Sequence, residues 1–224
     1  MASRLLQFEC FPCLQNRKVF LYSKPKRVPF LPSFVLVCEY TFHYLNAISL
    51  VIEIIECSKL FYAGYGSNLN ISQMRERCPK AKPLETGVLE NWQLCFKGVA
   101  DIFPSEGSIV NVGVYKITKE CENALDYYED YPNLYRKKYL SLDGYNKPIL
   151  TYVMNPGYGI GPPSTLYFNA IKDGYKDWNI KINDLLEAAK KSLHRGELEP
   201  YRSLRWKGTE LVTEDFLHAE QISQ

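Results

Sequence analysis

Leu60-Phe61-Tyr62-Ala63-Gly64-Tyr65-Gly66-Ser67-Asn68-Leu69 is the stretch that decides how the rest of the chain is interpreted. Its first half is aromatic-rich and apolar and ends at glycines, which predicts a short buried strand. The Gly66-Ser67-Asn68 turn that follows allows a bound molecule to approach the backbone closely and can present successive N–H donors to an anion. Taken alone, such a turn after a strand indicates only a change of direction.

Further helices and strands are indicated downstream of this loop. Asn70 or Ser72 can cap a helix over 71–78, Thr118 a helix with an apolar stripe at Cys121, Ala124, Leu125 and Tyr128, and Ser164 a helix closed by Gly174. A final amphipathic helix is expected over 182–193, followed by a polar tail. The β-leaning segments are 86–89, 92–97, 99–103, 109–117, 134–142 and 148–154, with turns at 104–107 and 143–146. This order predicts an α+β fold with a small mixed or antiparallel sheet, closed as a β-barrel and flanked by helices.

The composition changes near Lys59, which suggests three parts: an N-terminal extension of doubtful function over 1–58, a domain over 59–180, and a C-terminal helix and tail over 181–224. An apolar stretch over 30–55 approaches membrane-spanning length. Glu39 and Glu53 interrupt it, and a central charge costs about 2.5–3.5 kcal/mol on insertion scales. Membrane insertion is therefore disfavoured, and a membrane-associated protein remains the remotest interpretation.

Charge and cysteine usage narrow the class of protein further. The 27 basic and 25 acidic residues give a net charge of +2, which lacks the basic excess of a nucleic-acid-binding protein. Seven cysteines without framework spacing favour a reducing cytoplasm, and the Cys10-Phe11-Pro12-Cys13 pair has no second pair at zinc-ribbon spacing. Three scattered histidines and the lack of nucleotide or metal motifs predict neither a metal site nor a cofactor.

The Tyr65-Gly66-Ser67-Asn68-Leu69 run resembles the signature loop of the γ-glutamylcyclotransferase superfamily. Other segments that resemble this family follow in the expected order, up to about residue 180: Ala100-Asp101-Ile102-Phe103-Pro104, Val112-Gly113-Val114-Tyr115, Leu125-Asp126-Tyr127-Tyr128-Glu129, Asp130-Tyr131-Pro132-Asn133-Leu134-Tyr135-Arg136, Tyr152-Val153-Met154 and Pro162-Pro163-Ser164 with Tyr167. The family fold, a small mixed barrel with helices packed on it, agrees with the predicted elements.

The resemblance implies an intramolecular reaction. The α-amine of a γ-glutamyl amino acid, peptide or amine attacks its own γ-carbonyl, giving 5-oxoproline and the free amine, so the enzyme chiefly has to fold its substrate for attack. Glu129 matches the catalytic glutamate, which would move the protons. The resemblance assigns substrate-binding positions to Tyr65, Gly66, Ser67, Asn68, Leu69, Tyr135, Tyr152 and Tyr167.

Other interpretations of the same residues remain open. Glu129 could be an exposed helix-end glutamate, each tyrosine could be core packing, and the chain could be a non-catalytic protein of this fold that binds a small molecule or a partner. The Gly157-Tyr158-Gly159-Ile160-Gly161 run lacks dinucleotide-binding spacing and opens onto prolines instead of a helix, so we expect a mobile loop at the mouth of the pocket. The γ-glutamyl compound used and the oligomeric state are not indicated.

Overall fold

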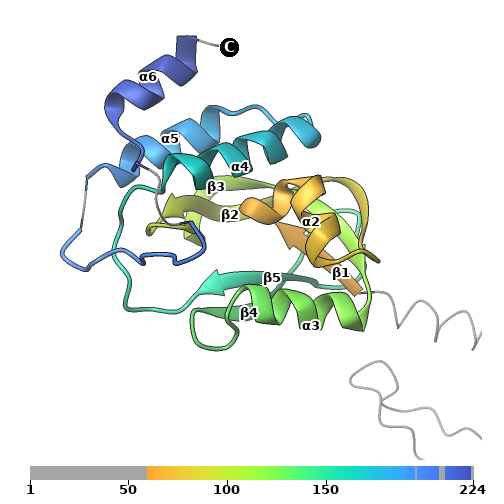
Figure 1. Ribbon diagram of the computed structural model, residues 1–224. Helices are drawn as coiled ribbons and strands as arrows, with labels where there is room; N and C mark the ends of the chain where they lie inside the picture. Colours follow the sequence, from red (N-terminus) through yellow and green to blue (C-terminus); the bar gives the residue numbers. More distant parts are fainter. Residues whose placement is uncertain (1–59, 195, 207–209, 223–224) are drawn as a thin grey trace, which may run out of the picture. The chain divides into compact units, whose positions relative to one another are not determined.

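Five strands form one mixed sheet in the order β2-β3-β1-β5-β4 (Figure 1). The computed structural model describes residues 60–194, 196–206 and 210–222, so the predictions for residues 1–58 lie outside the described residues. The strands are β1 (Leu60–Gly64), β2 (Lys82–Phe96), β3 (Ala100–Ile117), β4 (Tyr135–Leu140) and β5 (Ile149–Met154). β1 runs parallel to β5, and the other neighbouring strands pair antiparallel.

The α+β class and the mixed sheet are confirmed, whereas the closed barrel was wrong. Closing a barrel requires the two outermost strands to pair with each other. In the described part of the chain β2 and β4 stand at opposite ends of the sheet order, and helix α5 (Asn183–Ser192) packs against β2. β4 is also only six residues long, which leaves little edge to pair.

β2 and β3 form one long hairpin in place of the four strands that the sequence indicated. Trp92 pairs with Pro104, and the register resumes at Glu90 with Ile109, so residues 105–108 bulge opposite Asn91. Asn91 and Gly107 both adopt positive φ, and the Gly107 N–H donates to Asn91 Oδ1 at 3.0 Å. A bulge of this kind bends a strand without ending it, which is why the turn-like residues 104–107 were mistaken for a strand break.

Polar caps begin the helices where the sequence placed them. The Asn70 side chain accepts from Gln73 N at the start of α2 (Ile71–Arg77), Thr118 from Cys121 N at α3 (Lys119–Tyr128), and Ser164 from Tyr167 N at α4 (Thr165–Asp177). These side chains satisfy amides that have no partner within their helices.

Two helices, α4 and one in the tail, differ from the predictions. α4 continues beyond Gly174, where a Cβ would lie 2.5 Å from Leu69 Cβ, so this glycine allows close packing and does not end the helix. A further helix in the tail, α6 (Glu214–Ile222), was not predicted. No helix in the part of the chain that the structure describes is long and apolar enough to cross a membrane.

The loop after β1 is a 3-10 turn, η1 (Ser67–Leu69), fixed between the sheet and α4. The Tyr115 hydroxyl on β3 donates to Asn68 O at 2.9 Å, and the Trp178 indole N–H at the end of α4 donates to Leu69 O at 2.8 Å. Leu69 itself is completely buried. The loop with the motif is therefore part of the core, and its backbone is held from two sides.

Candidate active site

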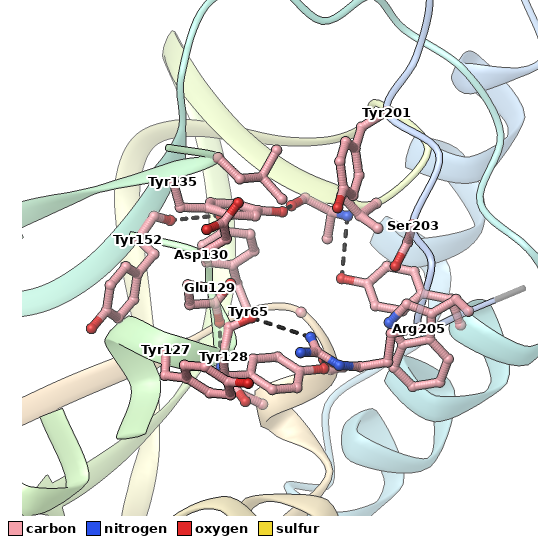
Figure 2. A pocket seen from close by; sticks show the side chains of 18 of the residues that line it. Tyr65, Tyr127, Tyr128, Glu129, Asp130, Tyr135, Tyr152, Tyr201, Ser203 and Arg205 are labelled. Atoms are coloured by element: carbon pink, nitrogen blue, oxygen red, sulfur yellow. Dashed lines mark hydrogen bonds between the residues drawn. The ribbon is translucent and has the colours of Figure 1, made fainter. Parts of the chain in front are cut away.

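A cavity of about 330 Å³ opens beside η1 and the C-terminal end of α3 (Figure 2). Its remaining walls come from strands β1, β3, β4 and β5, from α4, and from the connection between α5 and α6. Aromatic side chains predominate in the lining, which consists of Tyr62, Tyr65, Gly66, Ser67, Asn68, Val99, Ala100, Tyr127, Tyr128, Glu129, Asp130, Leu134, Tyr135, Tyr152, Tyr167, Tyr201, Ser203, Leu204, Arg205 and Trp206. Such walls offer flat apolar ring faces to a bound molecule.

Glu129 is presented to the cavity by the way α3 ends. It is the C-terminal cap of the helix, and its N–H donates to Leu125 O at 2.8 Å. Asp130 then adopts a positive φ of 50°, and the Tyr131 N–H returns to Asp126 O at 2.9 Å. This left-handed turn is a common helix ending, and aspartate tolerates it better than most residues. The chain leaves the helix there, and the Glu129 side chain points at η1.

The Glu129 carboxyl group is surrounded by protein although the residue as a whole is partly exposed at the cavity. Its Oε1 accepts from Asn68 Nδ2 at 2.7 Å. Burial raises the pKa of Glu129 to about 7, against the opposing effects of Arg77, of the Asn68 hydrogen bond and of Arg205. A carboxyl group with that pKa can both take up and release a proton near neutral pH.

Asn68 connects the signature loop to this carboxyl group. Its Nδ2 donates to Tyr62 OH at 2.8 Å as well as to Glu129, and its Oδ1 accepts from Arg77 Nη1 at 2.7 Å. An arginine can only donate, so Arg77 fixes which end of the amide faces Glu129. Arg77 also donates to Ser67 O at 3.3 Å. Sequence reasoning missed Arg77, because nothing in the α2 sequence signals that its side chain folds back onto the loop.

Four tyrosines predicted from the resemblance form cavity walls, and their hydroxyls bond to other parts of the protein. Tyr65 OH donates to Tyr152 O at 2.7 Å, and Tyr135 OH donates to Ala100 O at 2.6 Å. Tyr167 OH accepts from Ala100 N at 3.3 Å. Burial raises the pKa of Tyr65, Tyr135 and Tyr167 above the ordinary range, so all three stay neutral at physiological pH.

Tyr152 differs from the other three in where its hydroxyl points. It donates to Asp126 Oδ1 at 2.7 Å, and Asp126 Oδ2 lies 2.8 Å from Lys137 Nζ. Burial and the neighbouring Asp126 raise the pKa of Tyr152. This network ties α3 to strands β4 and β5, so Tyr152 joins the cavity wall to the helix that presents Glu129.

The structure brings all but one of the predicted site residues to the cavity. The residues that line it are Tyr65, Gly66, Ser67, Asn68, Glu129, Tyr135, Tyr152 and Tyr167. Leu69 does not line it and packs in the core. At Gly66 a Cβ would lie 3.2 Å from Tyr167 OH and 3.3 Å from Ala100 Cβ, so a side chain there would require these neighbours to shift by a few tenths of an ångström.

The C-terminal tail supplies a wall that the sequence did not indicate. Tyr201, Ser203, Leu204, Arg205 and Trp206 belong to residues 198–206, which we call the strap. The Trp206 ring packs edge-on against Tyr167 with 5.0 Å between ring centroids. These aromatic residues, in an otherwise polar tail, are the one signal that could have indicated packing against the domain.

The Tyr128 ring joins the signature loop to the strap. The guanidinium carbons of Arg77 and Arg205 lie 3.8 Å and 4.0 Å from its ring centroid. Ser67 Oγ and Tyr128 OH are 3.0 Å apart, and Arg205 Nη1 donates to Tyr128 O at 3.1 Å. Within residues 60–194, 196–206 and 210–222, no cluster of three or more His, Cys, Asp or Glu residues could hold a metal ion.

Known proteins resemble this chain in sequence and fold. Residues 62–178 match the family described as gamma-glutamyl cyclotransferase, AIG2-like. A solved structure named gamma-glutamyl cyclotransferase is 25% identical with a TM-score of 0.52, over 73% of this chain and 99% of that one. An uncharacterized protein from Homo sapiens is also 25% identical, with a TM-score of 0.51 over 75% and 99% of the two chains. YkqA from Bacillus subtilis, at 20% identity, a TM-score of 0.50 and coverage of 64% and 56%, shares the fold.

No curated protein sequence matches the chain. The family match spans more than half of the sequence and contains the loop, the strands around it and the helix that ends at Glu129. The chain therefore belongs to the AIG2-like gamma-glutamyl cyclotransferase family.

Proposed function

We propose that this protein is a γ-glutamylcyclotransferase that converts a γ-glutamyl amino acid, peptide or amine into 5-oxoproline and a free amine. The observation that carries the proposal is the hydrogen bond between Glu129 and Asn68 of the signature loop, at the wall of an aromatic cavity. A carboxyl group that only served solubility would have no reason to lie in such surroundings, because burying a charge is costly.

In the proposed mechanism Glu129 moves two protons in turn. The substrate's α-ammonium group gives a proton to the Glu129 carboxylate, and the neutral amine nitrogen attacks the γ-carbonyl carbon. A new C–N bond closes the five-membered ring. As the bond from that carbon to the leaving nitrogen breaks, the leaving nitrogen takes up the proton that Glu129 holds. The ring nitrogen gives its second proton to the freed Glu129 carboxylate, which passes it to the departing amine, so that the products are 5-oxoproline and an ammonium ion and Glu129 is again ionised. Atoms and charges balance without a cofactor, and the pKa of about 7 suits both transfers.

The cavity supports the ring closure in two further ways. Its walls hold the substrate folded, which supplies much of the rate enhancement when both reacting groups belong to one molecule. The backbone N–H groups of the Gly66-Ser67-Asn68 turn are suited to the substrate's α-carboxylate or to the oxyanion that develops on the γ-carbonyl. The neutral tyrosines add shape and no competing charge.

We also propose that the protein works in the cytoplasm. The cysteines that support this location are Cys78, Cys95 and Cys121, all of which are buried free thiols. Burial raises the pKa of Cys78 and Cys95 to about 12, so neither thiol is primed for oxidation.

The test is to incubate the purified protein with a panel of γ-glutamyl amino acids, peptides and amines and to quantify 5-oxoproline. Glu129→Gln should lower kcat by about 10²–10⁴-fold, because it removes the general acid–base group while keeping the shape. Glu120→Gln is the matched control, since Glu120 lies on the same helix, α3, and is fully exposed. Binding without 5-oxoproline from any substrate would favour a non-catalytic binding protein.

A further inference from the structure

Three glycines fix the strap across the domain. A Cβ at Gly159 would lie 1.8 Å from Leu198 O, one at Gly98 would lie 1.9 Å from Tyr201 O, and one at Gly161 would lie 2.6 Å from the Pro200 ring. No other residue type leaves room for the strap at these positions without moving backbone or ring atoms.

Backbone hydrogen bonds hold the same contact. The Gly159 N–H donates to Glu199 O at 3.0 Å, and the Tyr201 N–H donates to Lys97 O at 2.9 Å. The loop over 157–161 was expected at the mouth of the pocket, but none of its residues lines the cavity. Its glycines instead form the seat of the strap, so the segment that follows Tyr201 has a defined path along the cavity.

The strap brings Arg205 to the opening of the cavity. The side chain is exposed, and its guanidinium stacks on the Tyr128 ring, with one donor on Tyr128 O (Figure 2). A guanidinium has five N–H donors in a planar fork that suits a carboxylate. Among the described residues, no carboxylate lies within ion-pair distance of Arg205.

Arg77, on the other face of Tyr128, is used differently. Its donors go to Asn68 Oδ1, Ser67 O and Gln73 Oε1, so it supports the signature loop from behind. Arg77 does not line the cavity, whereas Arg205 is the one cationic side chain among the described residues that do. Of this arginine pair, only Arg205 lines the cavity, and among the described residues its one hydrogen-bond acceptor is Tyr128 O.

We propose that Arg205 determines substrate specificity by binding the carboxylate of the leaving amino acid, so that γ-glutamyl amino acids are preferred over γ-glutamyl amines. The inference rests on the proposed function. The reacting end of the substrate must lie against Glu129 and η1, and the leaving group then extends toward the opening, where Arg205 is the available cation. A γ-glutamyl amine carries no carboxylate at that end, so Arg205 does not strengthen its binding.

The test compares two substrates that differ only in this carboxylate, γ-glutamyl-alanine and γ-glutamyl-ethylamine. The ratio of their kcat/KM values is measured for the wild type, Arg205→Ala and Arg202→Ala. Arg202 is the matched control, because it lies on the strap, is exposed and does not line the cavity. Arg205→Ala should lower the ratio about tenfold, which is a modest effect for a charge-assisted hydrogen bond because the site is exposed to solvent. Added salt should weaken the preference of the wild type for γ-glutamyl-alanine, because salt screens the attraction between the two charges.

A ratio unchanged by Arg205→Ala, or equal losses on both substrates, would overturn the specificity role. Binding of both compounds is also measured by calorimetry, in the wild type and in Glu129→Gln, each with and without Arg205→Ala. These measurements separate a failure of the specificity role of Arg205 from a failure of the proposed enzymatic function. If no 5-oxoproline forms, the enzymatic proposal fails. Arg205 is then judged by whether its loss weakens binding of γ-glutamyl-alanine selectively, and equal weakening or none rejects it.

Discussion

The signature loop and the strap border the same cavity but are built in opposite ways. The loop over 65–69 is buried in the core and held by Tyr115 and Trp178, whereas the strap over 198–206 lies at the surface and is seated on glycines. The loop contacts Glu129 directly, whereas the strap forms an outer wall of the cavity and bonds to Tyr128 through Arg205. We infer that the fixed, local part supports the chemistry and that the separately attached part selects the leaving group.

Breaking the loop side of this comparison should have the largest effect. Asn68→Ala removes the donor to Glu129 Oε1 and should lower kcat by about 10–100-fold, the range for loss of a hydrogen bond to a charged group. Because that hydrogen bond lowers the pKa of Glu129, its loss should also move the acidic limb of the rate profile to higher pH. Steady-state kinetics across a pH series measures both changes.

Asn111→Ala is the control for this prediction. Asn111 Nδ2 donates to Asp184 Oδ2 at 2.8 Å, which is the same kind of bond away from the cavity. Equal activity losses in the two variants would mean that Asn68 acts only through stability.

Disturbing the seat of the strap should have a smaller and selective effect. Gly159→Ala places a methyl group against Leu198 O, so the strap must shift and take Arg205 with it. We expect the preference for γ-glutamyl-alanine over γ-glutamyl-ethylamine to fall by up to about tenfold, as with Arg205→Ala, while turnover of the amine substrate changes little. Gly196→Ala introduces the same methyl group into open space and should leave the ratio unchanged. A large loss on both substrates would show that the strap supports the chemistry as well.

The smallest expected effect concerns stability. Folded Glu129 keeps its proton up to about pH 7, whereas a glutamate in the unfolded chain loses it near pH 4.3. The folded state therefore binds more protons between these values, and the stability of the wild type falls as the pH rises through this window.

Glu129→Gln does not titrate, so its stability relative to the wild type should increase by about 1 kcal/mol from pH 4 to pH 8, after allowance for partial exposure. Urea unfolding at a series of pH values, with Glu120→Gln as the control, measures the difference. A constant difference across the series would contradict the raised pKa of Glu129.

Local patterns were enough to predict much of this molecule. The caps at Asn70, Thr118 and Ser164 lie where short side chains precede apolar stripes, and each satisfies helix amides within three residues. The family loop and Glu129 were predicted for a related reason, since each stands in a distinctive run of neighbouring residues. A feature that depends only on a few neighbouring residues can be recognised from the sequence alone.

Features that depend on distant partners could not be predicted. The 105–108 bulge depends on Asn91 across the hairpin, and Gly174 was taken for a helix end because its partner, Leu69, lies far away in the chain. The strap shows the same limit, since its position is set by Gly159 and Gly161 in one loop and by Lys97 and Gly98 in another. In the sequence, long-range packing of this kind is marked only by single glycines and aromatic residues, whose partners the sequence does not indicate.

The acidic limb of the pH–rate profile tests the central claim most directly. For the wild type acting on γ-glutamyl-alanine, kcat/KM should rise with pH and level off with an apparent pKa of about 7, because only the ionised Glu129 can accept the α-ammonium proton. The residual activity of Glu129→Gln should lack this limb. A wild-type limb at the ordinary carboxyl pKa, or the same limb in the variant, would contradict the assignment of proton transfer to Glu129.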